Sequence, residues 1–426
     1  MGSVIPSVVA AKNAGQTYAL YLPSSYSSDR SWPVVYVFDP LARGKFALEQ
    51  FQRAAEAQGF IVAASNNSRN GPWAPQLEAA DAMLDDTQWR FAVDLKRIYF
   101  AGFSGGARVA SRLAQLCKCA AGVILSGAGF PNGSPPSPDS RFAVFSAVGT
   151  SDFNYPEVIL LQEALQKAVS PHWLRTFDGK HEWAPSEVLE EALAWFRVQF
   201  MKTQHEPRDG DFLTSQLDAA TTRALRMENS GDLFSAFREY RQIEATFASA
   251  ADVSRVHLRV GALEKDKAVR DATRRERADF DEQDRLTREI FAPLSSLTTN
   301  ETTSSETTEK TLDLIRALRY RAQSEKRAER KLVLQRALSG VFIGFIESGN
   351  GDLDAKDFPA AARDLACAAE AHPESDFVYR QLALARVLGG DRKGAVKALA
   401  MARDKAADKA EFQEWLHSQP LLSALQ

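Results

Sequence analysis

Short apolar runs alternate with amphipathic segments of helical length from the N-terminus to about residue 202. The apolar runs predict strands at 17–22, 34–38, 61–65, 98–102, 122–126, 143–149 and 173–177. The amphipathic segments predict helices at 45–58, 76–91, 106–117, 156–169 and 188–202. This alternation is typical of the α/β class, and we expect a doubly wound, mostly parallel sheet covered by helices.

Strand patterns stop after the polar stretch 203–211, so we place a domain boundary between residues 205 and 206. The part 206–426 is predicted to be entirely helical. Its helix pairs, with small residues at the crossings and Gly-Asp turns, resemble tetratricopeptide repeats. Two charged stretches, 253–291 and 310–338, flank a Ser/Thr-rich segment and predict a long helical hairpin.

Composition narrows the classes of function. The 426 residues are 45% hydrophobic, 25% charged and 10% aromatic, which is typical of a globular protein. Lys and Arg total 52 against 55 Asp and Glu, a net charge of -3, so the chain has no cation excess for binding nucleic acid. No apolar run approaches the ~18 residues that a transmembrane segment needs, and we expect none.

The sequence leaves two alternatives for the cellular compartment of the protein. The start of the chain lacks a basic region followed by an apolar one, as a signal peptide would have. If Met1-Gly2 replaces a removed signal peptide, the protein is extracytoplasmic, and otherwise the cytoplasm is the default.

The chain has three cysteines, Cys117, Cys119 and Cys367. They are too few for a disulfide framework or a four-cysteine zinc site, and we expect buried free thiols. No spacing of His with Glu or Cys suits a catalytic metal, so no metal and no cofactor are predicted.

The first candidate catalytic motif is Gly102-Phe103-Ser104-Gly105-Gly106, which follows an apolar run and begins a helical segment. A nucleophilic serine on a sharp strand-to-helix turn needs small residues two positions away on each side, because a side chain there would collide with the neighbouring strand and helix. Ser104 is therefore a candidate nucleophile.

Such a serine needs a histidine base that is oriented by a carboxylate. Of six histidines, His181 alone comes just after a predicted strand and just before the last helix of the first domain. Asp152 directly follows the predicted strand 143–149. Ser104, Asp152 and His181 thus form a complete nucleophile, acid and histidine series in chain order.

This series at three strand ends resembles the α/β-hydrolase family, in particular small esterases similar to feruloyl esterases, dienelactone hydrolases and polyhydroxyalkanoate depolymerases. The resemblance covers about the first 200 residues and implies a doubly wound α/β-hydrolase fold. It also implies that Ser104 attacks an acyl carbon, that His181 is general base and then general acid, and that Asp152 fixes the imidazole tautomer.

The resemblance further implies an oxyanion hole formed by the N–H of Gly105 and by an N–H in the loop after strand 34–38. Relatives usually carry His-Gly in that loop, whereas this chain has Asp39-Pro40-Leu41. Pro40 has no N–H, so Leu41 is our candidate for the second donor. Asp39 has two possible roles: it ties its own loop, or it binds a cationic or hydroxylated part of a substrate.

Further candidates for substrate binding follow predicted strands at the carboxyl edge of the sheet, where ligands bind in such folds. Each is also compatible with ordinary packing under a loop. They are Asn66, Trp73, Tyr155 and Trp183.

We therefore expect a serine hydrolase of the carboxylesterase type, with a small-molecule ester as substrate. One alternative is a catalytically degenerate hydrolase that acts as a scaffold through its helical repeats. A second is a peptidase or thioesterase with the same triad. In each case the helical repeats are a possible binding surface for a protein or peptide partner.

Overall fold

The computed structural model describes residues 1–133, 136–137, 140, 142–203, 208–295 and 301–425. These residues form two compact units, Met1–Arg275 and Glu276–Gln426. The boundary that we expected between 205 and 206 lies outside the described residues. The helices that follow it, as far as Arg275, belong to the first unit.

The first unit is built on a mixed sheet, which has eight strands within the described residues, in the order β1-β2-β4-β3-β5-β6-β7-β8. β2 runs antiparallel to both of its neighbours, β1 and β4, and the neighbouring pairs from β4 to β8 are parallel. The bounds are β1 (Val4–Ala10), β2 (Asn13–Tyr21), β3 (Trp32–Phe38), β4 (Ile61–Ser65), β5 (Val93–Phe103), β6 (Ala120–Ser126), β7 (Ala143–Gly149) and β8 (His172–Phe177). The predicted mostly parallel, doubly wound sheet is confirmed.

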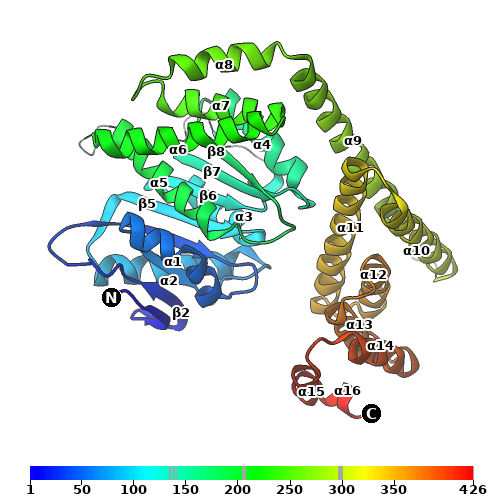
Figure 1. Cartoon of the computed structure of the whole chain (residues 1–426). Coiled ribbons are helices and arrows are strands. Elements are labelled where there is room, and N and C mark those ends of the chain that lie inside the picture. Colours follow the sequence, from blue (N-terminus) through cyan, green and yellow to red (C-terminus); the bar gives the residue numbers. More distant parts are fainter. Residues whose placement is uncertain (134–135, 138–139, 141, 204–207, 296–300, 426) are drawn as a thin grey trace. The chain divides into compact units, whose positions relative to one another are not determined.

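Helices cover both faces of this sheet (Figure 1). Strand residues alternate between two cores, as in β3, where Val35 and Val37 face one core and Val34 and Tyr36 the other. One core is closed by α1 (Gly44–Gln58) and α5 (Ser186–Lys202), and the other by α2 (Trp73–Arg90), α3 (Gly105–Leu116) and α4 (Tyr155–Lys167). All five predicted helices are confirmed within a few residues.

Three helices follow the sheet: the first packs on α5, the second on the first and on the edge strand β8, and the third on the second. They are α6 (Gly210–Asn229), α7 (Leu233–Phe247) and α8 (Ser254–Glu264). Trp195 Nε1 of α5 donates to Thr246 Oγ1 of α7 at 3.1 Å, and the N–H of Leu174 in β8 donates to Gln242 Oε1. A side chain thus satisfies an N–H on an otherwise open sheet edge, which explains why α6 to α8 belong to the first unit.

The second unit is all helical within the described residues (Figure 1), as predicted for this region. Its core is formed by apolar residues from α9 onward. The helices are α9 (Lys267–Ser295), whose start lies in the first unit, α10 (Glu301–Ser324), α11 (Ala328–Asp354), α12 (Phe358–Ala371), α13 (Asp376–Leu388), α14 (Arg392–Lys405), α15 (Lys409–His417) and α16 (Pro420–Ser423).

One turn recurs between consecutive helices of both units. A residue with positive φ precedes an Asp whose carboxylate accepts an N–H from the first turn of the next helix. The pairs are Gly231-Asp232 before α7, Lys356-Asp357 before α12 and Gly390-Asp391 before α14. Each of these residue pairs therefore ends one helix and starts the next, and two of the three are Gly-Asp.

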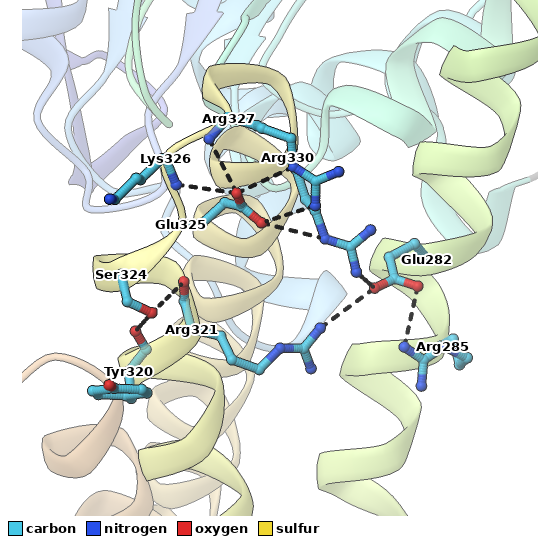
Figure 2. A network of polar contacts seen from close by, with 9 residues as sticks. All are labelled: Glu282, Arg285, Tyr320, Arg321, Ser324, Glu325, Lys326, Arg327 and Arg330. Atoms are coloured by element: carbon cyan, nitrogen blue, oxygen red, sulfur yellow. Dashed lines mark hydrogen bonds and ion pairs between the residues drawn. The ribbon is translucent and has the colours of Figure 1, made fainter.

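The charged stretches form more helices than the predicted hairpin. The stretch 253–291 is divided between α8 and α9, and the stretch 310–338 between α10 and α11. Figure 2 shows the second break, where Glu325 accepts the backbone N–H groups of Lys326 and Arg327 at 3.0 Å each. A side chain that binds these N–H groups competes with the helix for them. The segment 296–300 between α9 and α10 lies outside the described residues.

Helix α11 meets the length and hydropathy requirements of a membrane-spanning helix, with an 18-residue window of mean hydropathy 1.2. This differs from the expectation that no segment would do so. A core helix of a soluble protein passes the same test, and α11 contributes Leu334, Ala337, Val341 and Phe345 to the core of its unit. Hydropathy therefore does not by itself assign α11 to a membrane.

A disulfide joins Cys117 and Cys119 after the end of α3, so the prediction of free thiols is wrong for this pair. Their Cα atoms are 5.1 Å apart, within the usual range for a disulfide. The cysteine count had ruled out a framework of several bridges, but it does not exclude one local bridge. Cys367 is a buried free thiol as predicted, and burial raises its pKa to about 12.

Candidate active site

Ser104 stands alone between the end of β5 and the start of α3, with φ 52 and ψ -122. Its N–H donates to Ser126 O at 2.9 Å, which fixes the turn to β6. A Cβ on Gly102 would collide with the backbone of Gly106, and a Cβ on Gly106 with the carbonyl of Phe38. The turn therefore requires glycine on both sides of the serine, as the sequence argument expected.

His181 and Asp152 lie beside this serine. His181 Nε2 is 2.8 Å from Ser104 Oγ, and His181 Nδ1 is 2.9 Å from both carboxylate oxygens of Asp152. Because a carboxylate only accepts, Nδ1 carries the proton and Nε2 is free to accept from the serine hydroxyl. This is the arrangement needed to take a proton from Ser104 during nucleophilic attack.

Burial fixes the acid and the histidine in place. The side chain of Asp152 is fully buried and also accepts the N–H of Asn154 at 2.8 Å. The rings of Phe103 and Phe153 lie 4.7 and 4.4 Å from the imidazole, measured between ring centres. The imidazole is thus positioned by two aromatic rings and a buried carboxylate.

Asp39 is fully buried and ties two loops together. Its carboxylate accepts two hydrogen bonds from the Arg43 guanidinium, at 2.9 Å each, and one from the N–H of Leu41 at 2.9 Å. It also accepts from Trp183 Nε1 at 3.0 Å. Trp183 lies two residues after His181, so Asp39 connects the loop after β3 with the loop that carries the histidine. These contacts fit the first of its two expected roles, that of tying its own loop.

Of the two N–H groups expected to form the oxyanion hole, one is available and the other is not. Gly105 is the first residue of α3, so its N–H has no acceptor within the helix. The N–H of Leu41, in contrast, is already donated to Asp39. Pro40 O accepts the N–H of Asn70 at 2.9 Å, and Leu41 forms a β-bridge with Arg69. The second donor that we expected is therefore engaged.

The other predicted substrate-binding residues lie in different environments. Trp73 is the first residue of α2 and is 43% exposed. Trp183 and Tyr155 are buried, and Trp183 packs against Phe51 and Phe103. Asn66 Nδ2 donates to Pro6 O and Thr17 Oγ1 at 3.2 and 3.3 Å, which ties its loop to the N-terminal strands. Trp73 alone of these is largely open to solvent.

Sequence reasoning missed Asn70, whose side chain lies directly against Gly105. A Cβ on Gly105 would overlap Asn70 Oδ1 and lie 2.7 Å from Asn70 Cγ. An Asn beside a Gly in a loop usually signals a turn, so the sequence carried no separate sign of this position. Within the described residues, no group of His, Cys, Asp and Glu is arranged to hold a metal ion.

No family model and no curated protein matches the sequence. Solved structures with a similar fold include FphF, a fluorophosphonate-binding serine hydrolase of Staphylococcus aureus, at 13% identity and TM-score 0.38, covering 46% of this chain and 98% of that one.

An S-formylglutathione hydrolase from Agrobacterium tumefaciens is 16% identical with TM-score 0.37, covering 45% of this chain and 93% of the other. An esterase from Pyrobaculum calidifontis is 12% identical with TM-score 0.38, covering 46% and 86%. Because these scores are below 0.5, the assignment of fold class rests on the strand order and on the turn at Ser104.

Proposed function

We propose that this chain is a serine hydrolase that cleaves an ester of a small or medium acyl group through an acyl-enzyme. The observation that carries the proposal is the continuous series of hydrogen bonds from Asp152 through His181 to Ser104, which is half-buried at the turn between β5 and α3. A serine acquires nucleophilic character in this setting because the base accepts its proton as it attacks.

In the proposed reaction, Ser104 Oγ forms a bond to the acyl carbon while His181 Nε2 takes its proton. The electron pair of the carbonyl moves onto oxygen and is stabilised by the N–H of Gly105. Collapse of this intermediate expels the alcohol, which takes the proton from His181. Water then repeats the sequence and releases the acid, which restores Ser104. Asp152 stabilises the imidazolium throughout and does not take the proton.

The first experiment is labelling with a fluorophosphonate probe, comparing wild type with Ser104→Ala. We expect stoichiometric labelling of wild type and none of the variant, with nearly equal unfolding midpoints because the hydroxyl contributes little packing. A panel of chromogenic esters of increasing acyl length then defines the acyl group. Thioesters and amides in the same panel distinguish a thioesterase or a peptidase, which differ only in the leaving group.

A second candidate function is a non-catalytic binding protein, and the engaged N–H of Leu41 favours it. In that case the helical part of the chain, as tetratricopeptide-like repeats, binds a protein or peptide and the Ser104 site does not turn over substrate. Folded wild-type protein that is not labelled by the probe supports this candidate over the esterase.

A further inference from the structure

An oxyanion hole needs at least two hydrogen-bond donors aimed at the developing negative charge. On the side of the β3–α1 loop, the chain offers one N–H fewer than expected, because Pro40 has none and that of Leu41 is donated to Asp39. The Asp39 carboxylate is fully buried and is held by Arg43 and Trp183 as well. It is therefore a fixed acceptor that keeps the Leu41 N–H occupied.

The loop after β4 passes over this position. The N–H of Asn70 donates to Pro40 O at 2.9 Å, and Arg69 forms a β-bridge with Leu41. Both contacts hold the loop 66–72 against the loop 39–43. The side chain of Asn70 is thereby placed against Gly105, the residue that supplies the first donor.

Two properties suit the Asn70 side chain to donate here. Asn70 is exposed, and its side-chain amide makes no hydrogen bond within the part of the chain that the structure describes, whereas its backbone N–H is donated to Pro40 O. A Cβ on Gly105 would lie 3.2 Å from Asn70 Nδ2 and closer still to Oδ1. Rotation about Cβ–Cγ exchanges the oxygen and the nitrogen without moving the backbone, and a negatively charged oxygen selects the N–H end.

We infer that the side-chain amide of Asn70 is the second donor of the oxyanion hole. This inference rests on the proposed esterase function. Asn70 donates a hydrogen bond to the oxyanion and transfers no proton, so the series of proton transfers through His181 is unchanged. The same placement explains why residue 105 is glycine, because any side chain there would displace the Asn70 amide.

The test compares Asn70→Ala and Asn70→Asp with wild type, using p-nitrophenyl acetate as substrate and a trifluoromethyl ketone as a mimic of the tetrahedral intermediate. We expect kcat to fall about 100-fold in Asn70→Ala with little change in KM, and the inhibition constant of the ketone to rise in parallel. Asn70→Asp keeps the shape but has no donor, so it should be at least as impaired. Near-normal kcat in Asn70→Asp would overturn the inference.

Asn67→Ala is the control for disturbance of the loop. Asn67 accepts the N–H of Thr17 and donates to Gly15 O, so its loss loosens the same loop without touching Gly105. We expect a lower unfolding midpoint with kcat close to wild type. If Asn67→Ala lowers kcat as much as Asn70→Ala does, the loop and not the amide is responsible, and the inference fails.

Fluorophosphonate labelling of wild type separates this inference from the function on which it rests. Wild type that labels and turns over, with Asn70 variants of normal kcat, overturns the role of Asn70 alone. Folded wild type that neither labels nor turns over overturns the esterase proposal and the role of Asn70 with it.

Discussion

The acidic side chains around the Ser104 site and those of the network in Figure 2 lie in opposite environments. In Met1–Arg275, the carboxylates of Asp39 and Asp152 are fully buried, and each accepts hydrogen bonds from groups in fixed positions. In Glu276–Gln426, Glu282 and Glu325 lie among several arginines at helix surfaces and stay partly exposed (Figure 2). Exposed ion pairs contribute little, whereas a buried charge that loses its partners is costly. The burial of an acidic side chain and its fixed hydrogen-bond partners therefore affect the stability of the fold more than the number of ion pairs does.

The largest expected effect concerns His181, which the buried Asp152 orients. His181→Ala should lower kcat/KM by about 10⁴-fold or more, to the level of Ser104→Ala, because the three residues act as a unit. The measurement is kcat/KM for both single variants and for the double variant. A double variant far less active than either single one would show that the two residues contribute independently, against the proposed mechanism.

Substitution of Asp39 measures how much a buried carboxylate other than Asp152 contributes to stability. Asp39→Ala should lower the free energy of unfolding by about 2–4 kcal/mol, because Trp183 Nε1 and the N–H of Leu41 lose their acceptor. Urea denaturation of the full chain measures this loss. Asp39→Asn keeps an acceptor oxygen and should lose less, and equal losses in both variants would mean that the charge on Asp39, not its hydrogen bonds, is decisive.

Glu325 is an example of a partly exposed carboxylate, and its substitution should have the smallest effect on stability. Hydrogen bonds from Arg327 lower the pKa of Glu325 from 4.5 to about 2. Its contribution to stability is therefore present above pH 4.5 and is lost as the pH falls toward 2. Glu325→Gln should lower the unfolding midpoint slightly at pH 7, and the difference from wild type should vanish between pH 4.5 and 2. A difference that persists at pH 2 would contradict this assignment.

The sequence predicted most of the sheet unit, since alternation of apolar and polar positions is set by which face each residue buries. Chain order predicted that Ser104, Asp152 and His181 lie close together, because parallel strands bring their carboxyl ends to one edge, and the three side chains are hydrogen-bonded in series. β1 was missed because Pro6 interrupts its pattern. The structure accommodates Pro6 on an edge strand, between two residues where the register with β2 shifts.

Contacts between distant loops were not predictable in the same way. The use of the Leu41 N–H depends on the position of the Asp39 carboxylate, and the placement of Asn70 depends on how loop 66–72 crosses loop 39–43. Neither contact is encoded in a local sequence pattern. The break at Glu325 was missed for a related reason, because a charged residue that caps a break looks like one that continues a helix.

The backbone conformation of Ser104 carries an energetic cost that selection could remove. A residue other than glycine with φ 52 costs about 1–3 kcal/mol, and glycine would adopt the same turn more easily. A lineage selected only for persistence and for binding a partner would gain stability by exchanging this serine for glycine, a change that removes the hydroxyl. The strained backbone at Ser104 therefore has a physical reason if the hydroxyl is used in the proposed turnover, and has none in a protein that only binds.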